Sequence, residues 1–82
     1  MNTNEKAYWD AVSTVIRMEL TAIGLTQADM AEKVGVSRDA MGNYLRGKRD
    51  MPFGVLVKVA ESLGLTPHKL FGLAEDRLKQ GR

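Results

Sequence analysis

Apolar residues recur at helical spacing along nearly the whole chain, and no alternating apolar and polar run reaches the length of a strand. In the first segment they recur every three or four residues as far as Gly24, so one face is apolar. That face consists of Tyr8, Val12, Val15, Ile16, Leu20 and Ile23. The pattern predicts a helix over about residues 4–23.

Two shorter helices follow, each with a residue suited to begin it. Thr26 is followed three positions later by Asp29, which is the spacing of a capping box. Ser37 is placed to cap the next helix in the same way. Gly35 and Gly47 are expected to end these helices, because glycine readily adopts the left-handed conformation found after helix C-termini.

Two more helices are predicted from Pro52 and from Thr66-Pro67, since proline is favoured in a first helical turn. We expect the charged residues 75–82 to fray as a C-terminal tail. The predicted fold class is therefore all-α, with one compact five-helix domain over 1–82 and a core at about 5–74.

The region around Gly35 has the spacing of a helix-turn-helix, in which a short turn joins two helices. Ala31 is small where the helix over about 37–46 has to cross closely, and Gly35 can supply the positive φ of a tight turn. Val36 and Met41 are placed to anchor the 37–46 helix to the core. An ordinary helical hairpin in a small bundle remains the alternative.

A polar side of the 37–46 helix is left to face outward. It consists of Arg38, Asp39, Gly42, Asn43 and Arg46. Arginine reads guanine and asparagine reads adenine by paired hydrogen bonds in the major groove of DNA, so Arg38 and Asn43 are candidate base-reading residues. Gly42 costs about 1 kcal/mol relative to alanine inside a helix. Either a close approach to DNA or a crowded helix–helix contact would explain this glycine.

Three cations, Arg46, Lys48 and Arg49, cluster at and just past the end of this helix. Cations at such a place suit the phosphates of DNA, which position a reading helix without conveying sequence. A solvated loop with ordinary charges is the alternative.

Composition narrows the classes of function. The chain has 82 residues, which predicts one domain, and 44% of them are hydrophobic. The absence of cysteine and the lone His68 predict a protein that is no enzyme, with no catalytic residue, metal site or cofactor. No membrane span or signal peptide is recognised, so a cytoplasmic protein is expected. A formal net charge of +2 and a sequence pI of about 9.2 permit a nucleic-acid partner.

Residues 24–65 resemble the lambda-repressor-like helix-turn-helix domain, also described as the Cro/C1-type or XRE family. The resemblance is carried by "LTQADMA", "GVS", "RGKR" with a following proline, and "LVKVAESLGL". It implies a compact four- or five-helix domain and a phage-repressor or Cro-like transcriptional regulator. Such a regulator binds double-stranded operator DNA in a bacterial cell or phage-infected host. A small interaction module, such as an antitoxin or accessory DNA-binding subunit, is the alternative, and no small-molecule effector is evident.

Position by position, the resemblance implies that Arg38, Asp39 and Asn43 face the bases, with Gly42 giving clearance beside them. It implies phosphate contacts for Gln27, Ser37, Arg46, Lys48, Arg49 and the backbone near Phe53. Because a carboxylate repels phosphate, Asp39 is expected to accept from cytosine N4 or to pair with Arg38.

Besides Asp39, the sequence departs from the family at Leu20, Leu45 and Phe53. Relatives often have an arginine and a glutamate, which form an ion pair, where this chain has Leu20 and Leu45. Packed apolar residues can replace a buried ion pair without loss of stability, so we expect Leu20 and Leu45 to touch. Phe53 stands where relatives often have a serine as a helix cap.

The helix after Pro52 carries more apolar residues than one core-facing side needs. Dimers of this family read half-sites about one turn of DNA apart, roughly 34 Å, so a homodimer is expected. Its interface is assigned to Val55, Val57, Leu65, Pro67 and Leu70. A monomer with scattered apolar surface residues is the alternative.

Overall fold

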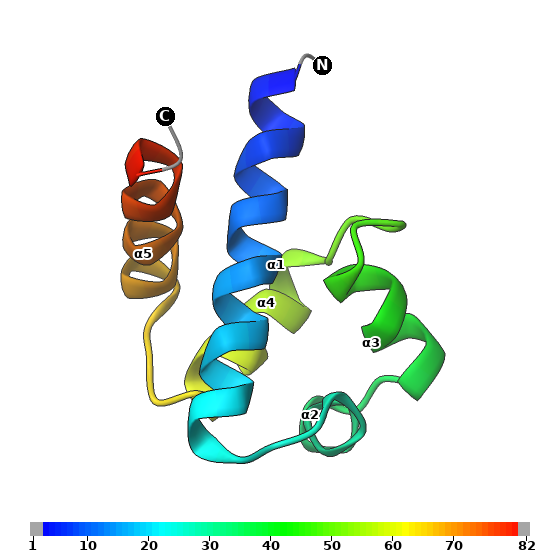
Figure 1. Cartoon of the computed structure of the whole chain (residues 1–82). Coiled ribbons are helices and arrows are strands. Elements are labelled where there is room, and N and C mark those ends of the chain that lie inside the picture. Colours follow the sequence, from blue (N-terminus) through cyan, green and yellow to red (C-terminus); the bar gives the residue numbers. More distant parts are fainter. Residues whose placement is uncertain (1–2, 81–82) are drawn as a thin grey trace.

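The computed structural model describes residues 3–80, which form five helices and contain no strand (Figure 1). The helices are α1 (Thr3–Ile23), α2 (Gln27–Val34), α3 (Arg38–Leu45), α4 (Phe53–Ser62) and α5 (Pro67–Gln80). The all-α, five-helix prediction is confirmed. None of these helices, within the part of the chain described, is long and apolar enough to cross a membrane.

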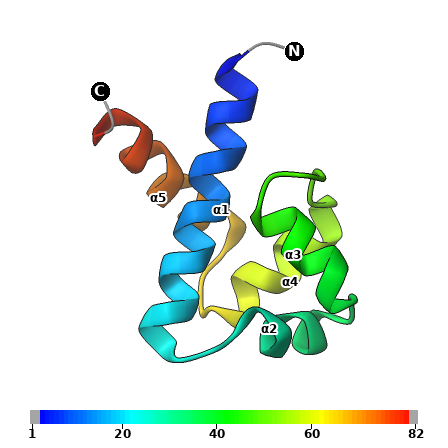
Figure 2. The same ribbon diagram turned by 45° about the vertical axis from the view of Figure 1, so that its right-hand side comes forward.

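The long helix α1 lies in the middle of the fold, and α4 also packs on α5. α5 runs beside α1 on one side, while α2, α3 and α4 gather on the other (Figures 1 and 2). α2 packs on α3 and on α4, and α3 also packs on α1. As a result, α3 lies on the side of α1 opposite α5, with one face against the core and one face open to solvent.

Every helix contributes a fully buried side chain to one core. The largest are Ile16, Met30, Met41, Leu45, Leu56, Leu70, Val12 and Val59. The prediction for the first helix is wrong at Ile23, whose exposed fraction is 50%. α1 ends at this residue, and the chain then turns toward α2, with the Leu25 N–H donating to the Leu20 carbonyl. The last turn of α1 is therefore only partly covered.

The predicted fraying from Glu75 is wrong for residues 75–80, which continue α5 as far as Gln80. Ala74 is fully buried and Leu78, one turn later, packs half-buried against the core. Desolvation by burial, together with the Glu75 carboxylate to which its hydroxyl hydrogen-bonds, raises the pKa of Tyr8. The apolar stripe of α5 thus extends through the charged segment and holds it against α1.

The predicted capping box and turn of the helix-turn-helix are both present. Thr26 Oγ1 accepts from the backbone N–H of Asp29 at 3.0 Å, and the Asp29 carboxylate accepts from the backbone N–H of Thr26 at 3.0 Å. These hydrogen bonds hold the pKa of Asp29 below its ordinary value. Gly35 has φ +80° and donates to the Ala31 carbonyl at 2.9 Å, which confirms the positive φ expected in the turn.

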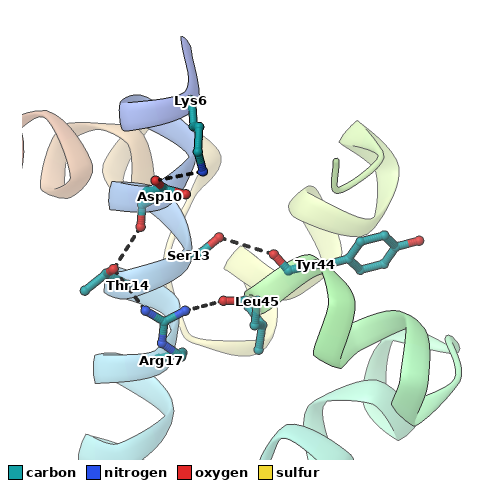
Figure 3. A network of polar contacts seen from close by, with 7 residues as sticks. All are labelled: Lys6, Asp10, Ser13, Thr14, Arg17, Tyr44 and Leu45. Carbon is teal, nitrogen blue, oxygen red and sulfur yellow. Dashed lines mark hydrogen bonds and ion pairs between the residues drawn. The ribbon is translucent and has the colours of Figure 1, made fainter. Parts of the chain in front are cut away.

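The C-terminal end of α3 is held by polar side chains of α1 (Figure 3). Ser13 Oγ donates to the Tyr44 carbonyl at 3.3 Å, and the Arg17 guanidinium donates to the Leu45 carbonyl. Arg17 is oriented by a second hydrogen bond to Thr14 Oγ1 at 3.1 Å. Carbonyls in a last helical turn have no partner in their own helix, and a cation there also interacts favourably with the helix dipole.

The two family ion-pair positions are apolar and buried, as expected. Leu20 is 3% exposed and Leu45 is 0% exposed, and both belong to the same core. Their direct contact stays a prediction. The polar connection between α1 and α3 is supplied one turn earlier in α1, by Arg17 acting on a backbone carbonyl.

We expect Arg17→Met to lower the free energy of unfolding by about 1 kcal/mol. Hydrogen bonds from charged donors contribute about 1.5–3 kcal/mol, and the exposure of Arg17 reduces that value. Lys6→Met is the matched control, because Lys6 forms an exposed ion pair with Asp10 at 3.4 Å and such pairs contribute about 0–1 kcal/mol. Urea denaturation checks this, and equal effects of both substitutions would contradict the role of Arg17.

The hydrogen bond from the Thr26 backbone N–H to the Asp29 carboxylate should make the free energy of unfolding depend on pH. Because the folded-state pKa is lowered, the carboxylate stabilises the fold above its unfolded-state pKa, and this contribution disappears as the pH falls through the folded-state pKa. The stability difference between the wild-type protein and Asp29→Asn should therefore shrink from about pH 6 to about pH 2. Chemical denaturation across this range measures it, and a difference independent of pH would refute the assignment.

Candidate nucleic-acid interface

The solvent-facing side of α3 and the beginning of α2 surround a hollow of about 290 Å³. It is lined by Gln27, Ala28, Arg38, Asp39, Gly42 and Arg46. All but Ala28 are residues that the sequence assigns to contacts with DNA. The fold therefore brings predicted residues of two helices to one surface.

The beginning of α3 offers both a cation and a free acceptor. Arg38 and Asp39 are its first two residues, and both are exposed. Among residues 3–80, the Asp39 carboxylate forms no ion pair, so the expected pairing with Arg38 is absent. The carboxylate remains available to accept a hydrogen bond, as the other expectation for Asp39, a hydrogen bond from cytosine N4, requires.

Hydrogen-bonding groups also lie at the starts of both helices. Ser37 Oγ accepts from the Ala40 N–H at 3.0 Å and so caps α3, as predicted. This cap uses the hydroxyl oxygen as acceptor, and the hydroxyl hydrogen can still donate to a phosphate. Gln27 is the exposed first residue of α2, directly after the capping Thr26.

Arg46 lies over the outward face of α3. Its Nη2 donates to Asn43 Oδ1 at 3.1 Å, so the side chain turns back toward the beginning of the helix. A Cβ built on Gly42 would lie 3.0 Å from Arg46 Nη1, and its three nearest atoms all belong to Arg46. Gly42 is consequently buried, although no other helix supplies any of those three atoms. The Arg46 side chain over Gly42 therefore differs from both explanations offered for this glycine, a crowded contact with another helix and a bare glycine that faces DNA.

The loop after α3 places further cations beside its last turn. The backbone N–H groups of Lys48 and Arg49 both donate to the Asn43 carbonyl, at 2.9 and 3.3 Å. The Arg49 guanidinium carbon lies 5.8 Å from the centroid of the Tyr44 ring, within the range of a cation–π interaction. Lys48 is exposed and stands beside this pair.

The predicted start of α4 at Phe53 is confirmed even though Pro52, which precedes it, has no side chain that could cap a helix. The backbone N–H of Leu56 donates to the carbonyl of Pro52, the residue that precedes α4, at 3.0 Å. The amides of Phe53 and Gly54 therefore point out of the helix start, as those of any helix N-terminus do. Phe53 itself is 67% exposed.

The assignment of Leu70 to a dimer interface is wrong, because Leu70 is 0% exposed within a single chain. Its place one turn into α5 directs it into the core, where α4 and α5 pack together. The other assigned residues, Val55, Val57, Leu65 and Pro67, are half-buried and reach the surface. Whether they contact a second chain stays a prediction.

A second hollow, of about 340 Å³, lies between α1 and the loop after α3. Its lining includes Trp9, Asp10 and Tyr44 together with Arg49 from the cation cluster. Nothing in the sequence pattern pointed to this hollow, because its two walls are far apart along the chain. The sequence pattern also gave no sign of the roles of Ser13 and Arg17, because their acceptors are backbone carbonyls of a distant helix.

Comparisons with known proteins agree with this geometry. The helix-turn-helix family model HTH_3 matches residues 16–70. The structure is also similar to a crystal structure of the clp gene regulator ClgR from Corynebacterium glutamicum, with a TM-score of 0.83 and 20% identity over 90% of this chain and 79% of that chain. A second ClgR structure gives 0.76 and 21% over 85% and 91%. No curated protein sequence matches the chain significantly.

At these identities the two ClgR structures show the fold alone. The family match concerns the sequence and shows the family. Its residues 16–70 include the whole of α2, α3 and α4, and so all the residues that line the hollow between α2 and α3. The resemblance recognised in the sequence is confirmed by this match. The chain belongs to the Cro/C1-type helix-turn-helix family.

Proposed function

We propose that the protein is a sequence-specific transcriptional regulator of the repressor or Cro type, which reads the major groove of double-stranded DNA with α3. The observation that carries this proposal is the hollow between α2 and α3, where Arg38 and Arg46 stand beside the free Asp39 carboxylate. Of these, Arg38 and the Asp39 carboxylate are side chains that match guanine and cytosine edges in a major groove. ClgR, which has this fold, is a regulator of clp genes, and this likeness also supports the proposal.

The groups around the hollow are suited to phosphates. Ser37 and Gln27 lie at the helix starts on one side, and Lys48 and Arg49 lie in the loop at the other end of α3. Contacts at both ends would fix the register of α3 on the duplex, while its central residues face the bases. The start of α4 at the exposed Phe53 has amide groups that would suit a further phosphate contact.

The competing interpretation is an interaction module that does not use DNA. An antitoxin of that kind needs a segment that is free to wrap a partner. Residues 75–80 instead continue α5, with Leu78 half-buried and Glu75 hydrogen-bonded to Tyr8. Residues 75–80 are therefore not a free segment, and the salt dependence of DNA binding separates the two interpretations.

The proposal is tested by the salt dependence of DNA binding. If each subunit contacts about five phosphates, log K should fall with log salt concentration at a slope of roughly −4 to −5 per subunit. Binding should be measured by fluorescence anisotropy on sites selected from a random duplex pool. Absence of DNA binding, or binding without a salt slope, would contradict the proposal.

Two substitutions separate the roles within the interface. Lys48→Ala should weaken binding to all sequences alike and reduce the magnitude of the salt slope by about 1, as expected for a lost phosphate contact. Arg38→Ala should cost about 1–3 kcal/mol on the selected site and relax preference at one base. Uniform losses from both substitutions would refute the assigned roles.

We also propose a homodimer that uses the half-buried apolar residues at the α4–α5 connection. Val55 and Val57 on α4 and Leu65 and Pro67 in the connection all reach the surface. Two half-sites of an operator, about 34 Å apart, would then be bound by two copies of α3.

Val57→Glu should shift the protein from dimer to monomer, because a charge in an apolar interface is costly to desolvate. Sedimentation of the free and DNA-bound protein measures this, with Glu32→Gln on α2, an exposed residue outside the proposed interface, as a control that should leave the dimer intact. A wild-type protein that is monomeric in both states would rule out the dimer.

A further inference from the structure

The side chain of Arg46 is placed differently from the other cations at the end of α3. Its backbone forms the C-cap of α3, where a side chain is free to leave the helix for a phosphate. The guanidinium instead turns back, lines the hollow beside Arg38 and Asp39, and donates to Asn43 Oδ1 at 3.1 Å. Lys48 and Arg49 do not line this hollow.

We propose that Arg46 is a base-reading residue, that Asn43 orients it, that Gly42 makes room for it, and that its target is guanine. This inference rests on the proposed function. It assigns Arg46 to the bases, whereas the sequence assigned it to phosphate.

The hydrogen-bonding capacity of the pair supports guanine as the target. A guanidinium has five N–H donors and no acceptor, so the Asn43 atom that faces it is the amide oxygen. One donor of Arg46 holds that oxygen, and enough remain for the paired hydrogen bonds to O6 and N7 of guanine. The Asn43 oxygen faces Arg46, which leaves its NH₂ group as a further donor beside the guanidinium. Adenine presents a donor, N6–H₂, where guanine presents the acceptor O6.

Gly42 explains how the guanidinium reaches this position. A Cβ at residue 42 would lie 3.4 Å from Nη2 and 3.0 Å from Nη1, and the shorter distance is tight enough that the Arg46 guanidinium would have to shift by a few tenths of an ångström. The far end of Arg46 would move, because it is the flexible partner in this contact. The absence of a side chain at Gly42 therefore allows the Arg46 guanidinium to lie over the helix at this point. Because the arginine covers it, Gly42 is buried although Arg46 itself is exposed.

The test compares full-length variants on DNA. Wild-type protein, Arg46→Lys, Gly42→Ala and Arg49→Lys are each used to select sites from a random duplex pool, and their affinities are then measured on every single-base variant of the wild-type site. Arg49→Lys is the matched control, since the same chemical change is made in a cation that does not line the hollow. Circular dichroism and thermal melting establish that each variant is folded.

The wild-type protein should prefer guanine at one position of the half-site by about tenfold to a hundredfold over the other bases. Arg46→Lys keeps the charge but loses the planar fork of donors, so this preference should fall to a few-fold or less. Gly42→Ala should weaken the preference at the same position while raising the melting temperature, because alanine favours a helix more than glycine does. Arg49→Lys should leave the base preferences unchanged.

Two results would overturn the inference while leaving the proposed function intact. One is an Arg46→Lys variant that loses affinity equally for all bases, as expected for a phosphate contact. The other is a Gly42→Ala variant that weakens binding uniformly, as expected if the glycine only gives clearance to the duplex. A wild-type protein that enriches no sequence would contradict the proposed function itself, and this inference with it.

Discussion

The placement of α3 depends on the hydrogen bonds that α1 makes to its C-terminal carbonyls. α3 has eight residues, and an isolated helix of that length is not stable in water. Its direction is therefore imposed from outside, by the buried side chains of Met41 and Leu45 and by Ser13 and Arg17 acting on the last turn (Figure 3). Because the apolar face packs into the core against α1 and α2 and the C-terminal end is bonded to α1, the opposite face of α3 is directed toward solvent.

The short length of α3 also shapes its outward surface. Two turns of helix offer few positions on one face, and Arg46 extends that face by turning back over Gly42 to Asn43. The glycine weakens the helix by about 1 kcal/mol relative to alanine, which the contacts from α1 can offset. The contacts that hold the C-terminal end of α3 and the side chains on its exposed face therefore lie within one turn of each other.

Features governed by neighbours in the sequence could be predicted, and features governed by distant neighbours could not. The Thr26 and Asp29 capping box and the positive φ of Gly35 follow from local rules, and both are present. Arg17 gave no such signal, because its acceptor is a backbone carbonyl 28 residues away. The burial of Leu70 and Leu78 likewise depends on which helices pack against α5, so local charge and apolar content led to wrong expectations for both. The unusual glycine at position 42 can be seen in the sequence. That the Arg46 guanidinium covers it could not be predicted, because this depends on the side-chain conformation of Arg46.

The claim that α3 reads bases in the major groove is tested most directly by chemical modification of the DNA. Guanines in a selected site can be methylated at N7, an acceptor that is exposed only in the major groove. The structure predicts that methylation of a guanine within the half-site prevents binding, while methylation outside the site has no effect. Undiminished binding to DNA methylated throughout the half-site would contradict recognition of guanine through this face of α3.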